Sequence, residues 1–190
     1  MRPQQIDLAR VGIETRYAGT VFRSRLEARW AAMFDLLEWR WDYEPVDLSG
    51  YVPDFFLHFP RGVLLAEVKP ATDRLELEAN ARKIQLSGWR KDFLLLGAGP
   101  LATEPAPVLG LFAYFEEWPG DEPGWMPPDD AEVHRCLRCQ KTSFHHASGS
   151  WFCPVCGAYD GNAYIESVDS KDVVAMWREA GNRVQWRKGI

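Results

Sequence analysis

Hydrophobic and polar positions change their spacing several times along the first two thirds of the chain. Five hydrophobic residues recur at the spacing of a helix that covers residues 22–37: Phe22, Leu26, Trp30, Met33 and Leu37. Residues 39–45 then alternate aromatic with charged side chains, which is the pattern of a half-buried strand. Residues 54–59 and 63–68 are apolar stretches on either side of a Pro-Arg-Gly turn, so they predict a hairpin.

A second helix and two further strands are expected after the hairpin. Residues 73–86 carry an apolar stripe at helical spacing, and Asp73 stands where it would cap the first turn. Residues 92–97 and 108–115 are short continuous apolar runs of the kind found in central strands. The order helix, three strands, helix and strands predicts an α/β fold around a mixed sheet.

Composition divides the chain into two units. Residues 1–117 contain the elements described so far, and the 190-residue chain is long enough for such a domain with a small appendage. Residues 118–132 are rich in proline and acidic side chains, so we expect a linker there. Residues 133–190 form the second unit, with all four cysteines and a C-terminal helix.

Charge and hydropathy narrow the range of partners only a little. The formal net charge of −5 argues weakly against nucleic acid, although arginine and lysine gather in local groups that could also be plain solvated surface. No apolar run approaches the roughly 20 residues of a membrane span, and residues 1–10 lack the apolar stretch of a signal peptide. We therefore expect no membrane partner and a cytoplasmic protein, in which cysteines serve as metal ligands more often than as disulfides.

The cysteines form two CxxC pairs separated by thirteen residues, and these are Cys136, Cys139, Cys153 and Cys156. Two tight turns of this kind can direct four thiolates at one ion, and four thiolates favour a closed structural zinc site. Gly157 suits the left-handed backbone that such turns need. We expect His145 and His146, between the pairs, to be exposed loop residues, with exchange for a cysteine ligand as the alternative. The unit resembles a zinc ribbon, a module that binds nucleic acid, binds protein or stabilises a chain end.

Three ionisable residues interrupt the hairpin. Alternate residues of a strand point to opposite faces, so Glu67 and Lys69 share a face while Val68 points into the core. Pairing across the short turn would bring Asp54 beside them. Two adjacent carboxylates are costly unless a cation lies between them, and hard oxygen ligands suit Mg²⁺ or Mn²⁺. Such an ion can polarise a phosphodiester and acidify a bound water, and a neighbouring ammonium can stabilise charge on the phosphate.

Pro53-Asp54 followed after twelve residues by Glu67-Val68-Lys69 resembles the signature of the PD-(D/E)xK nuclease superfamily, and the resemblance covers residues 15–115. It implies a restriction-endonuclease-like core of helix, three strands, helix and strand. It also implies that Asp54, Glu67 and the carbonyl of Val68 bind Mg²⁺ or Mn²⁺, and that Lys69 orients water or stabilises charge. Glu27, on the first helix, would be an additional ligand.

Further residue roles follow from the same resemblance. Many members use a polar residue on the helix after the motif, for which Lys83 and Gln85 are the candidates. Four arginines are candidates for DNA contacts: Arg23, Arg25, Arg82 and Arg138. Other readings stay open, since Asp54 could merely begin a strand, Glu67 and Lys69 could form an ion pair on an edge strand, and Glu27 could be a surface partner of Arg23.

The expected function is hydrolysis of DNA phosphodiester bonds by a magnesium-dependent endonuclease. Its substrate would be double-stranded or branched DNA, and its setting phage or mobile-element DNA processing, recombination or defence. Its protein partners would be a second copy of the chain, in a homodimer, or a larger recombination or defence assembly. The alternatives are a non-catalytic module that binds nucleic acid or protein on the same fold, and a nuclease that acts on RNA.

Overall fold

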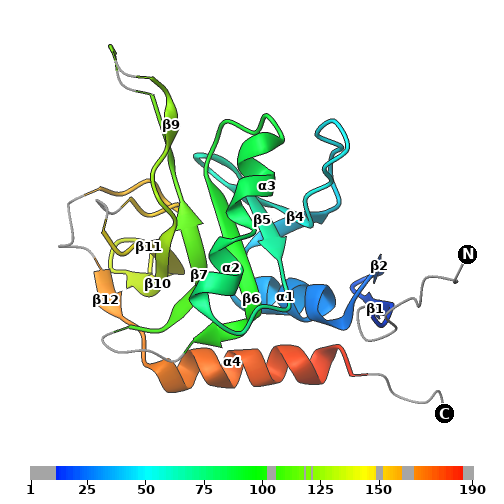
Figure 1. Ribbon diagram of the computed structural model, residues 1–190. Helices are drawn as coiled ribbons and strands as arrows, with labels where there is room; N and C mark the ends of the chain where they lie inside the picture. Colours follow the sequence, from blue (N-terminus) through cyan, green and yellow to red (C-terminus); the bar gives the residue numbers. More distant parts are fainter. Residues whose placement is uncertain are drawn as a thin grey trace, which may run out of the picture.

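A mixed, mostly antiparallel sheet forms the centre of the structure, a computed structural model (Figure 1). It describes residues 12–101, 106–117, 119–120, 122–148, 152–159 and 165–185. The main strands are β3 (Arg40–Tyr43), β4 (Phe55–Phe59), β5 (Gly62–Val68), β6 (Phe93–Leu101), β7 (Val108–Ala113), β10 (Asp129–Cys136) and β11 (Thr142–His146). They lie in the order β11-β10-β7-β6-β5-β4-β3, and β12 (Ile165–Ser167) also pairs with β10. Of these pairings, β5 with β6 is parallel and the others are antiparallel.

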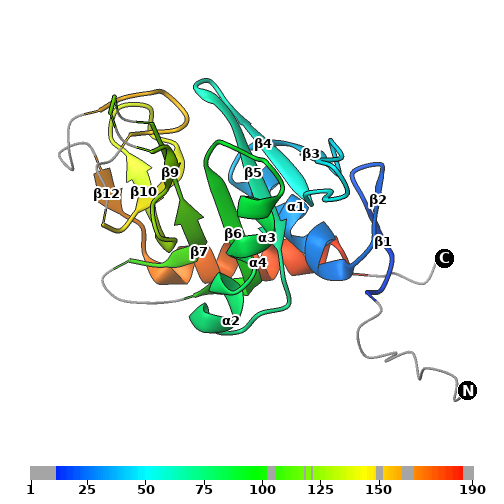
Figure 2. The same cartoon turned by 45° about the horizontal axis from the view of Figure 1, so that its top comes forward.

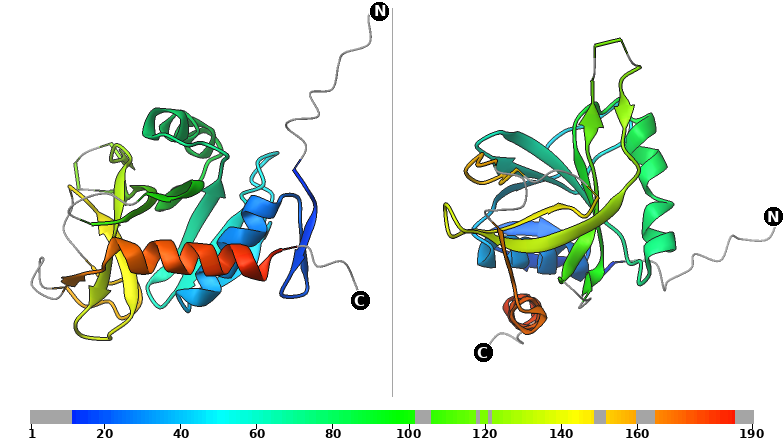
Figure 3. Two further views of the ribbon diagram at one scale, coloured as in Figure 1. Left: turned by 90° about the horizontal axis from the view of Figure 1, so that it is seen from below. Right: turned by 90° about the vertical axis from the view of Figure 1, so that its left-hand side faces the viewer.

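Helices cover both faces of the sheet. The longer helices are α1 (Arg25–Leu36) and α4 (Ser170–Arg183), which lie side by side (Figure 3, left) and share the larger hydrophobic core with one face. The short helices α2 (Arg74–Glu78) and α3 (Ala81–Leu86) pack with a second core on the opposite face. In Figure 2, α2 and α3 lie in front of the sheet and α4 lies behind it. Two small hairpins complete the fold, β1 (Thr15–Tyr17) with β2 (Thr20–Phe22) and β8 (Phe115–Glu116) with β9 (Gly124–Trp125).

The strands follow the sequence pattern closely. The alternating stretch 39–45 contains β3, and the two apolar stretches around the turn pair as β4 and β5 from Phe55–Ala66 to Phe59–Gly62. The continuous apolar runs become β6 and β7, which are neighbours in the middle of the sheet. The predicted order of helix, strands, helices and strands is therefore present in a mixed α/β fold, and its likeness to restriction endonucleases stays a prediction.

Both expected helices differ from their predicted extent. The first begins later in the sequence, and the second is broken in the middle. The first helix begins at Arg25 because Ser24 caps it, and Phe22 belongs to β2. The second is capped by Asp73 as expected but breaks into α2 and α3. At the break, the side-chain amide of Asn80 donates to the Glu76 carbonyl, a local bond that competes with the helical backbone pattern.

The expected division into two units differs from what the structure shows. Residues 129–132, predicted to lie in the linker, form the first half of β10 and pair with β7 of the main sheet. The C-terminal helix, assigned by sequence to the cysteine-rich unit, packs on α1, where the Trp177 ring lies 4.6 Å from the Trp30 ring between centroids. The main sheet and the cysteine-rich segment thus share strands and a core. None of the helices in the described part of the chain is both long and apolar enough to span a membrane.

Candidate functional site

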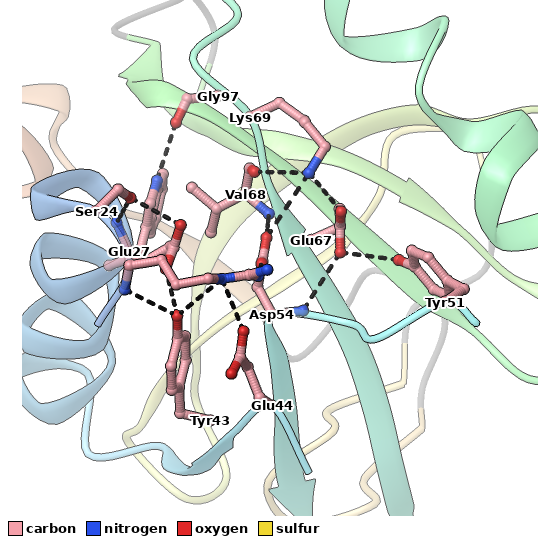
Figure 4. Close-up of polar contacts among 12 residues, drawn as sticks. Ser24, Glu27, Tyr43, Glu44, Tyr51, Asp54, Glu67, Val68, Lys69 and Gly97 are labelled. Atoms are coloured by element: carbon pink, nitrogen blue, oxygen red, sulfur yellow. Dashed lines mark hydrogen bonds and ion pairs between the residues drawn. The ribbon is translucent and has the colours of Figure 1, made fainter. Parts of the chain in front are cut away.

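The β4–β5 hairpin brings two carboxylates together at one end of the sheet (Figure 4). Its last ladder pair is Phe55 with Ala66, so the next residues, Asp54 and Glu67, lie side by side. Both are buried, with 3% and 6% of their surface exposed. The backbone N–H of Asp54 donates to Oε2 of Glu67 at 3.3 Å. The hairpin register expected from the sequence is therefore confirmed, and β5 is a central strand rather than an edge strand.

Glu67 is held by three donors, two of them side chains. Lys69 Nζ donates to Oε1 of Glu67, and its second bond goes to the carbonyl of Val68 at 3.0 Å. The hydroxyl of Tyr51 donates to Oε2 of Glu67 at 2.8 Å. Burial, followed by the charge of Glu67, raises the pKa of the Tyr51 hydroxyl, so that group stays protonated and keeps donating. The Val68 side chain points into the larger core, as the strand alternation predicts.

Asp54 accepts one bond from the backbone and one from an arginine. The N–H of Val68 donates to Oδ2 at 2.8 Å, and Nη2 of Arg23 donates to Oδ1 at 2.8 Å. Lys69 Nζ lies 3.8 Å from Oδ2. Burial and the charge of Glu67 raise the pKa of Asp54 to about 7, although Lys69 and the Val68 N–H act in the opposite direction. The donors around Asp54 thus offset only part of the cost of burying its charge.

Glu27 lies at the start of α1, 9% exposed, and its carboxylate is already engaged. The Ser24 hydroxyl donates to Oε1 at 2.8 Å and accepts from the Glu27 N–H at 3.2 Å, which together cap the helix. The Tyr43 hydroxyl donates to Oε2 at 2.5 Å. Arg23 connects this group to Asp54, because its backbone N–H and Nε both donate to the Tyr43 oxygen. Burial and the bond to Glu27 raise the pKa of Tyr43 to about 12.

The structure therefore gathers Asp54, Glu67, Val68 and Lys69 directly, and Glu27 through Arg23 and Tyr43. Glu27, Asp54 and Glu67 are not among the described groups that bring three or more metal-ligating atoms within 4.8 Å of one another. The guanidinium of Arg23 binds Oδ1 of Asp54, the oxygen that Val68 does not use, and it also pairs with Glu44 at 2.7 Å. The ionic partners of Arg23 are thus Asp54 and Glu44, not Glu27 as one sequence-based alternative supposed.

The remaining nuclease-type candidates lie apart from these carboxylates. Lys83 and Gln85 are on α3, and no hydrogen bond or ion pair joins either to Asp54, Glu67 or Lys69 within the described residues. All four arginines proposed for DNA contacts have exposed side chains: Arg23, Arg25, Arg82 and Arg138.

Sequence reasoning missed both tyrosines of the site. Tyr51 lies in the loop before β4 and Tyr43 ends β3, and both reach carboxylates that are sixteen residues away in sequence. The alternation of β3 predicted that Tyr43 would be half-buried, which is a weak signal for a polar partner inside. No comparable signal marks Tyr51, because loop residues have no periodicity from which a direction can be read.

The four cysteines form a compact group with the dimensions of a zinc site. Sγ of Cys136 lies 3.8 Å from that of Cys156, and Sγ of Cys139 lies 3.8 Å from that of Cys153. Four thiolates at about 2.3 Å from a tetrahedral zinc ion are about 3.8 Å apart. Such a spacing is far longer than a disulfide bond of about 2.05 Å. The group could hold a structural metal ion such as zinc.

The two turns that carry the cysteines have the same backbone. The N–H of Gln140 donates to the Cys136 carbonyl at 2.7 Å, and the N–H of Gly157 donates to the Cys153 carbonyl at 2.8 Å. Both donors have left-handed backbones, with φ of +60° and +71°. The expected role of Gly157 is confirmed, whereas Gln140 adopts the same backbone despite its side chain.

His145 and His146 are buried in β11 rather than exposed in a loop, so the expectation for them was wrong. They are 7% and 6% exposed, and strand pairing with β10 explains the burial. The described cysteine group is complete without a histidine.

In comparisons with family models, curated proteins and solved structures, the chain gave no match, so the interpretation of these sites rests on their geometry.

Proposed function

We propose that the protein is a metal-dependent endonuclease that hydrolyses DNA phosphodiester bonds at Asp54, Glu67 and Lys69. The observation that carries the proposal is the juxtaposition of two buried carboxylates and one ammonium at the end of neighbouring strands. This constellation agrees with the PD-(D/E)xK motif in the sequence.

The carboxylate pair suits a hard divalent cation. Asp54 and Glu67 supply oxygen ligands from adjacent strands. Burial and the charge of Glu67 raise the pKa of Asp54, and a nearby cation would act in the opposite direction by favouring the charged form. Mg²⁺ or Mn²⁺ would be held by these two side chains with the Val68 carbonyl as a third ligand, and by Glu27 as an additional one. When bound, such an ion neutralises phosphate charge and makes its bound water more acidic.

Three side chains around the carboxylates each have a defined task in this proposal. Lys69, anchored between Glu67 and the Val68 carbonyl, stabilises charge on the phosphate or orients the attacking water. Tyr51 fixes the orientation of the Glu67 carboxylate. Arg23, which has 60% of its side chain exposed, would exchange Asp54 for a substrate phosphate, since a guanidinium binds either group through paired hydrogen bonds.

An incubation of the purified protein with nucleic acid tests the proposal. Plasmid, linear duplex, branched DNA, single-stranded DNA and RNA are each incubated with Mg²⁺, with Mn²⁺ or with EDTA. We expect cleavage of duplex or branched DNA that requires the metal. Lys69→Ala should lower the cleavage rate by about 10²–10³-fold, the usual effect of removing one group that stabilises transition-state charge.

The matched control is Lys171→Ala, which removes an exposed lysine at the start of α4. It should cleave at the wild-type rate. Wild-type activity in Lys69→Ala would remove the assignment, and metal-dependent cleavage of RNA alone would redirect it to a ribonuclease.

A non-catalytic binding module is the second candidate, and a specific observation favours it. Arg23 and Lys69 already neutralise Asp54 and Glu67 within the chain, as a closed network with a structural role would. This function predicts DNA or protein binding without cleavage under any metal condition. It also predicts that Mg²⁺ and Mn²⁺ leave the melting temperature unchanged, whereas the nuclease proposal predicts a metal-dependent rise that Asp54→Asn abolishes.

For the cysteine group, we propose one structural zinc ion in a zinc-ribbon module. Four thiolates leave no open position for a substrate, so the ion would stabilise the C-terminal end of β10 and the turn at residues 153–157. The module would then contribute to DNA or partner binding through the exposed surface around Arg138.

A further inference from the structure

Three other potential metal ligands lie together on β10 and β11, apart from the hairpin carboxylates. Glu132 and His134 are two residues apart on β10, so their side chains share one face of the sheet. His145 of β11 is the direct partner of Glu132 in the ladder. Val133, between the first two, points to the opposite face and is fully buried in the larger core. Strand geometry thus places a carboxylate and two imidazoles side by side.

The distances among these groups match a small transition-metal ion. Nε2 of His134 lies 3.4 Å from Oε2 of Glu132, and Nε2 of His145 lies 3.9 Å from the same oxygen. The three ligand atoms all lie within 4.8 Å of one another. Nitrogen and oxygen ligands of a tetrahedral zinc ion, bonded at 2.0–2.1 Å, are about 3.4 Å apart. A movement of roughly half an ångström by His145 would bring its Nε2 to this spacing from Oε2 of Glu132.

Hydrogen bonding does not account for this arrangement. The separation of 3.9 Å is too long for a bond from His145 to Glu132, and 3.4 Å is long for one from His134. Both rings are more than nine-tenths buried, and their Nδ1 atoms have no hydrogen-bond partner within the described residues. Burying the two Nε2 atoms without a good hydrogen bond is costly unless another interaction compensates, and a metal ion bound at Nε2 would supply it.

The charge of the cluster also favours a cation. Within the described residues no lysine or arginine pairs with Glu132, in contrast to Asp54 and Glu67. Two imidazoles and one carboxylate form a nitrogen and oxygen donor set that suits a divalent ion of the zinc type.

We propose that Glu132, His134 and His145 form a second metal site, separate from the cysteine group, that binds a divalent transition-metal ion of the zinc type. Two imidazoles and one carboxylate leave one coordination position open, unlike the closed set of four thiolates. The Glu132 side chain is 23% exposed, so the cluster borders solvent on the side of its carboxylate. Both sites would share β10, which carries Cys136 two residues beyond His134.

The metal content of the full chain tests this site. Wild-type protein and a His134→Gln/His145→Gln variant are loaded with zinc, dialysed against zinc-free buffer and measured by inductively coupled plasma mass spectrometry. We expect the wild type to hold one zinc equivalent more than the variant. His58→Gln and His146→Gln are matched controls outside the cluster, and each should retain the wild-type content. Equal zinc in wild type and double variant would overturn the proposal.

A second measurement needs no variant and so does not depend on how the double variant folds. X-ray absorption at the zinc edge of the loaded wild-type protein reports the average coordination shell. We expect sulfur together with nitrogen and oxygen ligands, because a closed site of thiolates and a histidine–carboxylate site would contribute jointly. A shell of sulfur alone would mean that the cysteine group is the sole site and would reject the inference.

Discussion

At the scale of single residues, the hairpin site is defined by how each buried carboxylate oxygen is paired. Lys69 and Tyr51 each donate to one oxygen of Glu67, and Arg23 and the Val68 N–H each donate to one oxygen of Asp54. Charged acceptors in a buried position lose several kcal/mol of hydration, so each of these bonds contributes more than a bond at the surface. The energy of the site is therefore sensitive to removal of one hydroxyl.

Tyr51→Phe removes such a hydroxyl and leaves the ring in place. Oε2 of Glu67 would keep only the long bond from the Asp54 N–H, at 3.3 Å. We expect the free energy of unfolding to fall by about 1.5–3 kcal/mol, the range for a hydrogen bond to a charged group. Chemical denaturation followed by circular dichroism measures the change.

The matched control for Tyr51→Phe is Tyr159→Phe, since Tyr159 is 53% exposed. Its free energy of unfolding should stay within about 0.5 kcal/mol of the wild type. An equal effect of the two substitutions would show that the Tyr51 hydroxyl does not support Glu67.

The candidate site could be predicted from the sequence only where strand geometry fixes the direction in which a side chain points. Alternation along β5 is sufficient to place Glu67 and Lys69 on one face, and a short turn is sufficient to bring Asp54 beside them. The pairing of Arg23 with Asp54, across 31 residues, depends on how α1 meets the sheet. No local pattern encodes that contact, and the histidines of β11 were misjudged for the same reason.

At the scale of elements, close approach of neighbouring strands constrains the centre of the sheet. Continuous apolar runs in the sequence identified β6 and β7. The distance between the two strands, however, depends on a glycine of β7, and a hydrophobic pattern gives no information about that residue. A Cβ atom on Gly110 of β7 would lie 2.0 Å from the Leu95 carbonyl oxygen of β6. Glycine at this position therefore permits the pairing of the two strands.

Gly110→Ala should consequently separate β6 from β7 or displace the backbone. Overpacking of this kind costs about 1–3 kcal/mol, which lowers Tm by roughly 2–12 °C in a chain of this size. Differential scanning calorimetry gives the shift. Gly124→Ala is the control, because a Cβ at Gly124 would meet no atom within 4 Å. A Tm of Gly110→Ala equal to that of the control would contradict the close approach.

At the scale of the whole molecule, the cysteine-rich segment and the main sheet form one structure. Local composition suggested a linker because residues 118–132 are rich in proline and acid, and such residues disfavour regular elements on their own. Tertiary partners override this preference, since Arg74 of α2 pairs with Asp130 at 2.6 Å and with Asp129 at 3.1 Å. With their charge compensated, both acidic residues enter β10. Composition cannot reveal a partner that lies more than fifty residues away.

Trp177 on α4 gives a test of this continuity. Its ring packs on Trp30 and lies 3.9 Å from the Arg29 guanidinium, while its carbonyl accepts two bonds from that same arginine. Trp177→Ala removes the ring contacts and keeps the carbonyl. We expect a loss of roughly 2–4 kcal/mol, below the 3–5 kcal/mol of a fully buried tryptophan because the ring is partly exposed.

If α4 belongs to the main core, the loss of stability in Trp177→Ala should affect the whole sheet and not α4 alone. Urea denaturation should then keep one transition at a lower midpoint, and hydrogen exchange should speed up in β5 and β6 as well as in α4. The control is Val174→Ala on the same helix, where the side chain is 40% exposed and the expected change is within about 0.5 kcal/mol. Faster exchange confined to α4 and the cysteine turns, with β5 and β6 unchanged, would instead mean that the C-terminal segment folds as an independent unit.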